Sequence, residues 1–268
     1  MMGKAWIGLT LAAVTCGLAG FPAAAQCVKQ SPAHAVALIE LYTSEGCCSS
    51  CPPADRWLSR IERDGYNVDE VIPLSLHVDY WDQLGWKDRF ASARFTERQR
   101  VLATLSRSRV VYTPEIFLNS REVRNWNSAA EFRQAVTKIN ATPALADIRL
   151  ELDLASPAQL PIKARFTLKS GVAGRQPQAF IALYENKLVT DVKAGENRNV
   201  SLHHDYVVRE WIGPLELDGG KAEFRKTLAL DRAWNPKNLG VAAFVQDLGS
   251  GEVLQATALP FCGRGSNG

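Results

Sequence analysis

The sequence has few features that would tie it to nucleic acid or to zinc. Its net charge is only +3 over 268 residues, which gives no general attraction for nucleic acid. Arginines cluster between Arg89 and Arg124, but glutamates are interspersed and an aromatic ladder is missing, so we expect a solvated helix face there. A second cysteine or histidine pair at the spacing of zinc ligands is also missing. The leading interpretation therefore includes no nucleic acid, no metal and no cofactor.

Long apolar runs are missing too, apart from one at the start. Lys4 precedes an apolar stretch, 5–20, that is shorter than the ~20 residues needed to span a bilayer, and Ala23-Ala24-Ala25 follows it. Charge, apolar core and small residues in this order are typical of a secretory signal peptide. We expect residues 1–25 to be removed near Ala25. The mature protein would then have no membrane span and would be periplasmic or secreted.

The cysteines suit an exported protein. Cys16 would leave with the signal, and an odd number remains: Cys27, Cys47, Cys48, Cys51 and Cys262. An odd number in an oxidising compartment leaves at least one thiol free or bonded to another chain. Cys27 and Cys262 lie at opposite ends of the mature chain, and we expect a disulfide that ties the two termini together. A bond from Cys27 to Cys47 is the alternative.

The first half of the mature chain, 26–143, alternates strand-like and helix-like patterns. The order is βαβαββα, which predicts a mixed sheet with helices on both faces. Pro73 indicates that the second strand begins late or lies at an edge. The expected strands are 35–42, 71–78, 116–118 and 122–123, and the expected helices are 55–64, 92–105 and one that opens at a capping box, Ser128 and Glu131.

The second half, 144–268, shows only short alternating segments separated by glycine, proline, asparagine and aspartate. This pattern predicts an all-β, sandwich-like domain, which would position a partner or substrate against the first half. Its strands are expected near 147–154, 161–168, 179–185, 205–212, 222–230, 240–246 and 253–259. His203 and His204 are neighbours in a strand and would point to opposite faces, so we interpret them as surface or interface residues rather than metal ligands.

Three cysteines fall in "EGCCSSCPPADRW", between the first strand and the first helix. At the amino end of a helix, unpaired N–H groups and the helix dipole favour a thiolate. A two-residue spacer lets one thiolate attack a target disulfide while the second resolves the mixed disulfide. We therefore expect Cys48 to be the attacking thiol, Cys51 the buried resolving thiol and Cys47 a free thiol.

At this point the sequence resembles the thioredoxin superfamily. Cys48-Ser49-Ser50-Cys51 has the Cys-x-x-Cys spacing after the first strand, and Thr113-Pro114 precedes the hairpin where that fold keeps a cis-proline facing the dithiol. More narrowly, "ELYTSEGC", "CPPADRWL", "HVDYWDQLGWKD" and "VYTPE" resemble a family of exported bacterial proteins with a thioredoxin-like domain of unknown function. The resemblance implies a thioredoxin-like fold, a dithiol at Cys48 and Cys51, and a proline loop at Thr113-Pro114 that pairs with an extended substrate.

The sequence departs from that family's Gly-Cys-x-x-Cys-Pro-Pro motif by having two adjacent cysteines. Counting back from Pro52 selects Cys48, whereas counting forward from Gly46 selects Cys47. Whether Cys47 or Cys48 pairs with Cys51 therefore stays open.

The predicted function is that of a thiol–disulfide oxidoreductase-like protein whose partners are protein thiols and disulfides of the cell envelope. The direction of electron flow and the oligomeric state are not predicted. One alternative is a purely structural disulfide, and another is a non-catalytic envelope binding protein. A third is a copper-delivery protein of thioredoxin fold that uses Cys47, Cys51 and His77, although strand periodicity places His77 opposite the core face. The aromatic residues Tyr80, Trp81 and Trp86 would line a groove beside the dithiol or pack on the core.

Overall fold

The structure is a computed structural model that describes residues 26–47, 49–108, 110–170, 172 and 175–262. The predicted signal peptide, 1–25, lies outside the described residues. In the first half the elements are β1 (Gln26–Gln30), β2 (Ala37–Thr43), α1 (Cys51–Leu58), β3 (Val71–His77), η1 (Asp82–Leu84), α2 (Ala93–Leu105), β4 (Glu115–Leu118), β5 (Arg121–Glu122) and α3 (Ala129–Asn140). In the second half they are β6 (Ala146–Asp153), β7 (Gln159–Leu168), β8 (Pro177–Glu185), β9 (Leu188–Asp191), β10 (Ser201–His204), β11 (Val207–Glu216), β12 (Lys221–Ala229), η2 (Pro236–Asn238), β13 (Leu239–Asp247) and β14 (Val253–Pro260).

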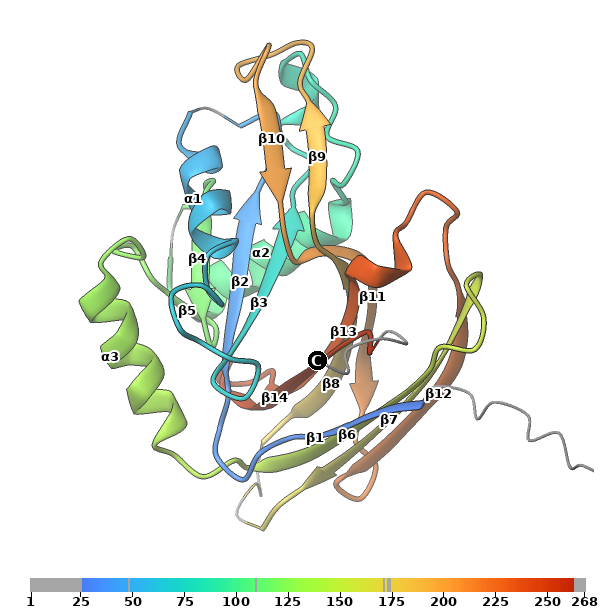
Figure 1. The fold of residues 1–268 in the computed structure, drawn as a ribbon. Helices are drawn as coiled ribbons and strands as arrows, with labels where there is room; N and C mark the ends of the chain where they lie inside the picture. Colours follow the sequence, from blue (N-terminus) through green and yellow to red (C-terminus); the bar gives the residue numbers. More distant parts are fainter. Residues whose placement is uncertain (1–25, 48, 109, 171, 173–174, 263–268) are drawn as a thin grey trace, which may run out of the picture.

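The strands form two sheets and a separate hairpin (Figure 1). The large sheet has the order β14-β13-β8-β11-β3-β2-β4-β5, and the small sheet has the order β1-β6-β7-β12. The strands β9 and β10 pair only with each other. The described part of the chain is therefore rich in strands, and its α-helices all lie in the first half.

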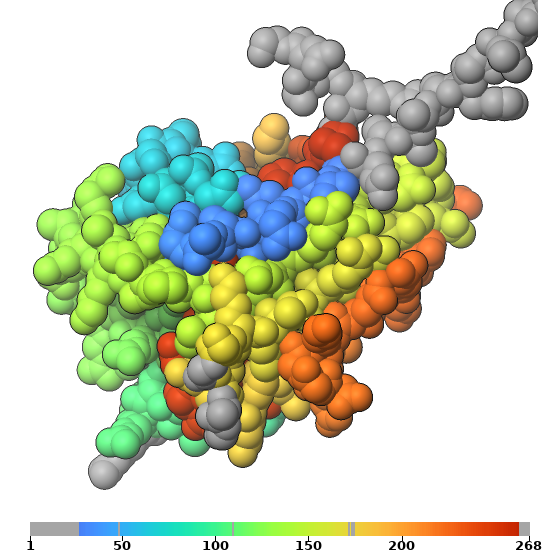
Figure 2. Space-filling view, turned by 90° about the horizontal axis from the view of Figure 1, so that it is seen from below, coloured from blue at the N-terminus to red at the C-terminus, as the bar shows by residue number. Residues whose placement is uncertain are grey.

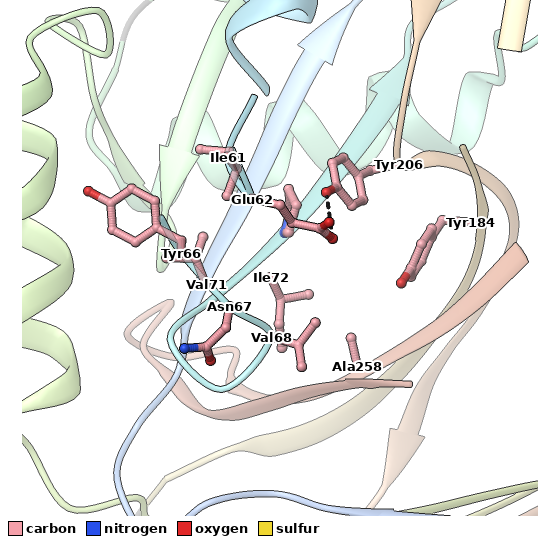
Figure 3. A pocket seen from close by; sticks show the side chains of 11 residues that line it. Ile61, Glu62, Tyr66, Asn67, Val68, Val71, Ile72, Tyr184, Tyr206 and Ala258 are labelled. Carbon is pink, nitrogen blue, oxygen red and sulfur yellow. Dashed lines mark hydrogen bonds between the residues drawn. The ribbon is translucent and has the colours of Figure 1, made fainter. Parts of the chain in front are cut away.

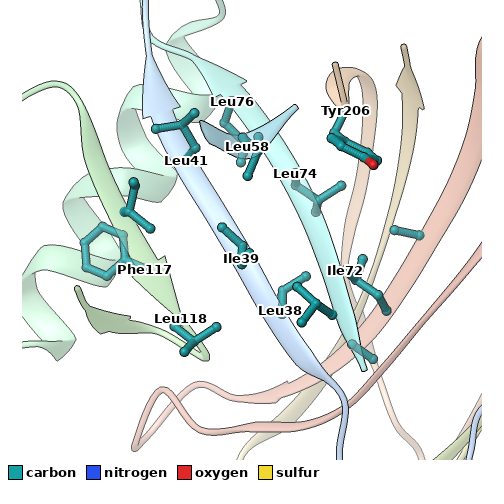
Figure 4. Packing of buried hydrophobic residues seen from close by; sticks show 14 of the residues in the cluster. Leu38, Ile39, Leu41, Leu58, Ile72, Leu74, Leu76, Phe117, Leu118 and Tyr206 are labelled. Carbon is teal, nitrogen blue, oxygen red and sulfur yellow. The ribbon is translucent and has the colours of Figure 1, made fainter. Parts of the chain in front are cut away.

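The predicted order βαβαββα is present as β2-α1-β3-α2-β4-β5-α3. The strands β2 and β3 are parallel, whereas β4 runs antiparallel to both β2 and β5. The side chains of Ser92 and Ser128 accept hydrogen bonds from the N–H groups of Arg94 and Glu131, so α2 and α3 begin where their caps predict. Figure 4 shows apolar side chains of β2, β3 and β4 packed into one core. This core fixes the ends of β2 and β3, where the candidate site lies.

The prediction that Pro73 places its strand at an edge is wrong. The strand β3 begins at Val71 and lies between β2 and β11. The amide of Ser75 donates to the carbonyl of Tyr206, so odd-numbered residues of β3 direct their N–H groups towards β11. Because β11 begins only at Val207, no strand partner stands opposite Pro73 on that side. The missing N–H of proline therefore leaves no ladder bond broken.

In the second half, the seven predicted segments are all strands, and the two sheets pack face to face. The apolar core between them contains Ile148, Leu150, Leu152, Ile162 and Phe166 from the small sheet and Ile181, Leu183, Val241 and Val245 from the large sheet. The strand β1, which the sequence did not predict, pairs antiparallel with β6. Seen from below in Figure 2, β1 lies as a blue segment against the yellow-green strands of the second half. The first residues described are therefore part of the second half's core.

The predicted disulfide between Cys27 and Cys262 is confirmed, with a Cα–Cα distance of 6.0 Å. It joins β1 to the segment after β14, so the two ends of the described chain are tied together. Pairings also cross the predicted boundary at residues 143 and 144. Besides β1 with β6, Val207 of β11 lies in parallel register with Ser75 of β3. Figure 3 shows Tyr206, which precedes β11, with its hydroxyl bonded to Glu62 of the first half at 3.1 Å.

Arg98 corrects the expectation that the arginines between Arg89 and Arg124 form a solvated face. Its side chain is only 8% exposed and donates to both carboxylate oxygens of Glu40 on β2. Its guanidinium also lies 5.1 Å from the ring centroid of Phe180 on β8. The helix α2 is amphipathic, and Arg98 is on its buried side because Glu40 compensates its charge.

Candidate active site

The candidate site lies where β2 ends and α1 begins, and its centre is a disulfide. Cys47 is bonded to Cys51, the first residue of α1, with a Cα–Cα distance of 6.0 Å. Both cysteines are fully buried. The expectation that Cys47 is a free thiol is therefore wrong. The turn after β2 brings the sulfur of Cys47, rather than that of the next residue, to the start of the helix. Cys48 lies outside the described residues, and its role as the attacking thiol stays a prediction.

The proline loop faces this disulfide. The Thr113–Pro114 peptide bond is cis, as expected. The Thr113 hydroxyl donates to the sulfur of Cys47 at 3.3 Å and accepts a hydrogen bond from Trp81 Nε1 at 2.7 Å. The indole thus orients the hydroxyl towards the sulfur. Thr113, Pro114 and Cys51, which the sequence predicted as site residues, are brought together around Cys47.

The loop after β3 forms one wall of the site. Tyr80 and Trp81 pack partly buried against the core, and Trp86 Nε1 donates to Glu45 Oε2 at 2.8 Å. A Cβ atom on Gly46 would lie 3.2 Å from the carbonyl oxygen of Trp86, so the wall touches the turn that carries Cys47. Tyr80 and Trp81 therefore pack on the core, and Trp81 and Trp86 contact the site, while the groove that the sequence suggested stays a prediction.

The tip of the β9–β10 hairpin, residues 192–200, lies on the same turn. Asn197, which is 6% exposed, donates through Nδ2 to the carbonyl oxygens of Glu45 at 2.9 Å and Cys47 at 2.7 Å. The hairpin stands beside α1 and the end of β2 in Figure 1. A segment 150 residues further along the chain therefore contacts the cysteine turn directly. Single-sequence patterns contain no signal for such a contact.

A buried group of charged side chains adjoins the turn. His77 Nδ1 lies 2.6 Å from Asp88 Oδ2, and this same oxygen accepts the N–H of Glu45 at 2.8 Å. His204 Nε2 lies 3.5 Å from Glu45 Oε1, while its Nδ1 lies 3.7 Å from Asp55 Oδ2 on α1. The two imidazole rings are in edge contact, with centroids 5.0 Å apart. The group joins β3, α1, β10 and two loops.

These contacts correct two predictions about histidine. His77 is fully buried rather than opposite the core, because β3 lies inside a sheet that is covered on both faces. His204 is 1% exposed rather than on the surface, whereas its neighbour His203 is exposed. The expectation that the two side chains point to opposite faces is therefore confirmed. The choice of face for His204 depends on its carboxylate partners, which are distant in sequence.

Burial and mutual charge set the ionisation of this group. Burial alone would lower the pKa of His77, but the Asp88 carboxylate outweighs burial and raises it. Burial alone would likewise raise the pKa of Asp88, and His77 together with hydrogen bonds from backbone N–H groups lowers it. Burial raises the pKa of Asp55, and His204 and His77 oppose that change only in part. Each member of the His77–Asp88 contact therefore favours the charged form of the other.

A further titratable group follows the proline loop. Glu115 is fully buried, and burial raises its pKa to about 7 although Gln99 Nε2 donates to its Oε2 at 2.7 Å. The same amide nitrogen donates to the carbonyl of Tyr112. A carboxyl group that changes charge near neutral pH thus adjoins Pro114. Glu115 was not among the site residues predicted from the sequence.

In the described ranges, no three His, Cys, Asp or Glu side chains are grouped so as to hold a metal ion. Over the same residues, none of the helices combines the length and apolar character required to cross a bilayer.

A family model described as "Protein of unknown function (DUF1223)" matches residues 38–246. This span includes the Cys47–Cys51 disulfide, the proline loop and the hairpin. The chain belongs to the DUF1223 family. This DUF1223 protein is similar to the crystal structure of protein AGR_C_4864 from Agrobacterium tumefaciens, with 25% sequence identity and a TM-score of 0.60 over 88% of this chain and 99% of that chain.

The DUF1223 chain is also similar to the solved structure of HBP35 of Porphyromonas gingivalis. The TM-score is 0.63 and the identity is 14%, over 89% of this chain and 81% of that chain. At this identity the likeness shows the fold alone. No curated protein matches the chain.

Proposed function

We propose that this DUF1223 protein is an exported thiol–disulfide oxidoreductase with a thioredoxin-like first half, and that Cys47 and Cys51 are its redox pair. The observation that carries the proposal is the contact of the Thr113 hydroxyl, beside the cis-proline, with the sulfur of Cys47 at 3.3 Å. A disulfide at the start of a helix and facing a proline loop is the arrangement that the family resemblance implies. The sheet order β3-β2-β4-β5, with β4 antiparallel to β2, supports the thioredoxin-like assignment.

The chemistry is a transfer of two electrons from a dithiol of the partner to the Cys47–Cys51 disulfide. A partner thiolate attacks the sulfur of Cys47, forming a partner–Cys47 bond and breaking the Cys47–Cys51 bond, so that Cys51 leaves as a thiolate. The dipole of α1 favours that thiolate, while Pro52 and Pro53 leave two positions of the first turn without an N–H group. A second partner thiolate then attacks the partner sulfur and releases Cys47. The partner becomes a disulfide, the protein becomes a dithiol, and two protons pass to the protein thiols.

Trapping separates the two possible attacking cysteines. In a Cys51→Ser variant the remaining thiolate can still attack a partner disulfide, which is the reverse direction of the exchange, but no Cys51 thiolate is left to displace the partner, so envelope proteins should accumulate covalently bound to this protein. Mass spectrometry of the trapped peptides identifies the attacking thiol as Cys47 or Cys48. A Cys47→Ser, Cys51→Ser double variant should trap nothing if Cys47 is the attacking residue. Normal expression of Cys51→Ser without any trapped partner would reject the exchange reaction and favour a structural disulfide or a non-catalytic binding protein.

Export to the envelope is part of the proposal. Lys4, the apolar stretch and Ala23-Ala24-Ala25 have the order of a secretory signal, and two disulfides fit an oxidising compartment. Amino-terminal sequencing of the protein from a periplasmic fraction should begin at Gln26. A cytoplasmic protein that retains Met1 would contradict this part of the proposal.

Copper delivery is a second candidate because the observed pair has its Cys-x-x-x-Cys spacing. The residues fit a metal poorly, however, since His77 Nδ1 is bonded to Asp88 and no described group of three ligands is assembled. The reduced protein should be titrated with Cu(I) under a competing chelator. Tight binding of one ion, weakened by His77→Ala, would favour this candidate over the exchange reaction.

A further inference from the structure

The Cys47–Cys51 disulfide is closed off from the surface. Both cysteines have no exposed area. Thiol–disulfide exchange needs a third sulfur to approach one of the two sulfurs directly, so access limits the rate. Part of the fold must move before any reductant can react with this pair.

The hairpin tip 192–200 is hydrogen-bonded to the cysteine turn. Asn197 supplies the two hydrogen bonds to the carbonyl oxygens of Glu45 and Cys47. Gly195 packs against the loop after β3 so closely that a Cβ atom on it would lie 3.1 Å from the Cβ of Trp86. The tip therefore rests on the turn and on the wall of the site at the same time.

The hairpin is built so that its tip can separate from the site without disturbing either sheet. The strands β9 and β10 have four residues each and pair only with each other. A two-stranded hairpin has little stability of its own. Towards its base, Val192 and Leu202 are buried and His204 lies 3.5 Å from Glu45 and 3.7 Å from Asp55, whereas Val200 is 43% exposed. The buried base and the more exposed tip are the parts of a hinged cover.

We propose that the tip 192–200 is a cover that must lift from residues 45–47 before a partner sulfur reaches the disulfide, and that Asn197 is its latch. The biological purpose of the cover rests on the proposed exchange reaction. Its physical effect does not, because the cover controls the reaction of the disulfide with any reductant. Lifting breaks both Asn197 bonds and separates Gly195 from Trp86, while β10 stays attached through His204.

The test measures how fast dithiothreitol reduces the pair. A Cys48→Ser background removes the third thiol, and timed alkylation with mass spectrometry follows each disulfide separately. Asn197→Asp keeps the size of the side chain but replaces its donor by an oxygen that faces two carbonyl oxygens. Since each hydrogen bond changes such an opening equilibrium by several-fold, the loss of two should speed reduction of Cys47–Cys51 by about tenfold or more.

A second variant and two controls make the result specific. Gly195→Ala should also speed reduction, because its new methyl group presses on Trp86 without touching the latch. Glu196→Gln changes the exposed neighbour of Asn197 and should leave the rate unchanged. The Cys27–Cys262 bond, on the far strand β1, is the internal control and should be reduced at the same rate in every variant.

Two outcomes would overturn the cover. The first is that Cys47–Cys51 is reduced no faster in Asn197→Asp and in Gly195→Ala than in the wild-type protein. The second is that the wild-type protein is reduced at this bond as fast as an exposed peptide disulfide. If both disulfides speed up together, the variants have loosened the whole fold and the latch is likewise rejected. The proposed function fails separately, by the absence of trapped partners in Cys51→Ser.

Discussion

Arg98 of α2 donates to Glu40 of β2 through two nitrogen atoms, at 2.8 and 3.0 Å, inside the core. The remaining terminal nitrogen reaches Gln246 of β13 at 2.7 Å. One side chain therefore connects a helix of the first half to strands of both halves. Burying an ion pair costs desolvation energy. Removing one partner leaves the other charge buried and uncompensated, so it should destabilise the fold more than removing both charges does.

Arg98→Met should lower the free energy of unfolding by about 3–5 kcal/mol, because it leaves the Glu40 carboxylate buried without a positive charge beside it and with the Tyr42 hydroxyl as a neutral donor. The double variant Glu40→Gln, Arg98→Met should lose less than Arg98→Met alone. Urea unfolding of the oxidised protein measures both values. Arg100→Met, on the exposed side of the same helix, is the matched control. If the single and double variants lose the same free energy of unfolding, the unpaired charge of Glu40 is not the cause of the destabilisation.

Thr113→Val removes the hydroxyl that contacts the Cys47 sulfur. A hydrogen bond to a charged group contributes about 1.5–3 kcal/mol, so the pKa of the Cys47 thiol should rise by ~1 to 2 units in the reduced protein. The reduction potential should fall by ~30 to 60 mV, because the thiolate form loses a donor. Thiolate absorbance and equilibration with glutathione measure the two quantities. Thr113→Ser keeps the hydroxyl and should behave like wild type, and a Thr113→Ser variant that shifts as far as Thr113→Val would exclude the hydroxyl as the cause.

Glu115 should make the protein less stable as the pH rises through the acidic range. Its pKa is about 7 in the folded protein and 4.5 in the unfolded chain, so between these values the folded state retains a proton that the unfolded state has lost. This contribution to stability is complete below pH ~4.5, is lost up to about pH 7, and amounts to ~2 to 3 kcal/mol.

Glu115→Gln should remove that dependence while its amide oxygen still accepts from Gln99. Compared with wild type, the variant should gain stability at about pH 8 relative to about pH 5. Denaturant unfolding at several pH values measures the difference, with the exposed Glu97→Gln as a control for the loss of one carboxylate. A pH profile parallel to that of wild type would contradict the prediction.

The Cys27–Cys262 bond closes a loop with a sequence separation of 235. In the chain-entropy model, the loss of such a link costs about 5 kcal/mol of stability. Cys27→Ser, Cys262→Ser should show this loss in urea. A non-reduced digest of the wild-type protein should contain a peptide with Cys27 joined to one with Cys262, and any other partner of Cys262 would refute the link.

The order of elements was predictable because it depends on local periodicity. The apolar positions of β2 and α2, the cap at Ser128 and the alternating segments of the second half are each visible within a short stretch of sequence. The proline at residue 114 was identified through the family resemblance rather than from periodicity. Elements that are short and lack an apolar pattern, such as β1 and the β9–β10 hairpin, were not predicted.

The contacts of the site were less predictable because they join distant parts of the chain. Spacing alone favoured Cys48 as the partner of Cys51, whereas the turn after β2 presents Cys47. His204 and Asn197 meet the turn only because the hairpin folds back across it. Neither residue type nor local pattern contains that information.

The parallel pairing of β3 with β11 has a consequence for any attempt to divide this protein. A fragment that ends at residue 143 would lose β11 and leave Ser75 without its strand partner, at the edge of a strand that is buried throughout in the full chain. Such an edge recruits other strands and leads to aggregation. It would also lose the strand partner of β1, leaving Cys27 at the end of an unpaired segment. The cysteine-bearing half therefore depends on the second half for strand partners at both β1 and β3.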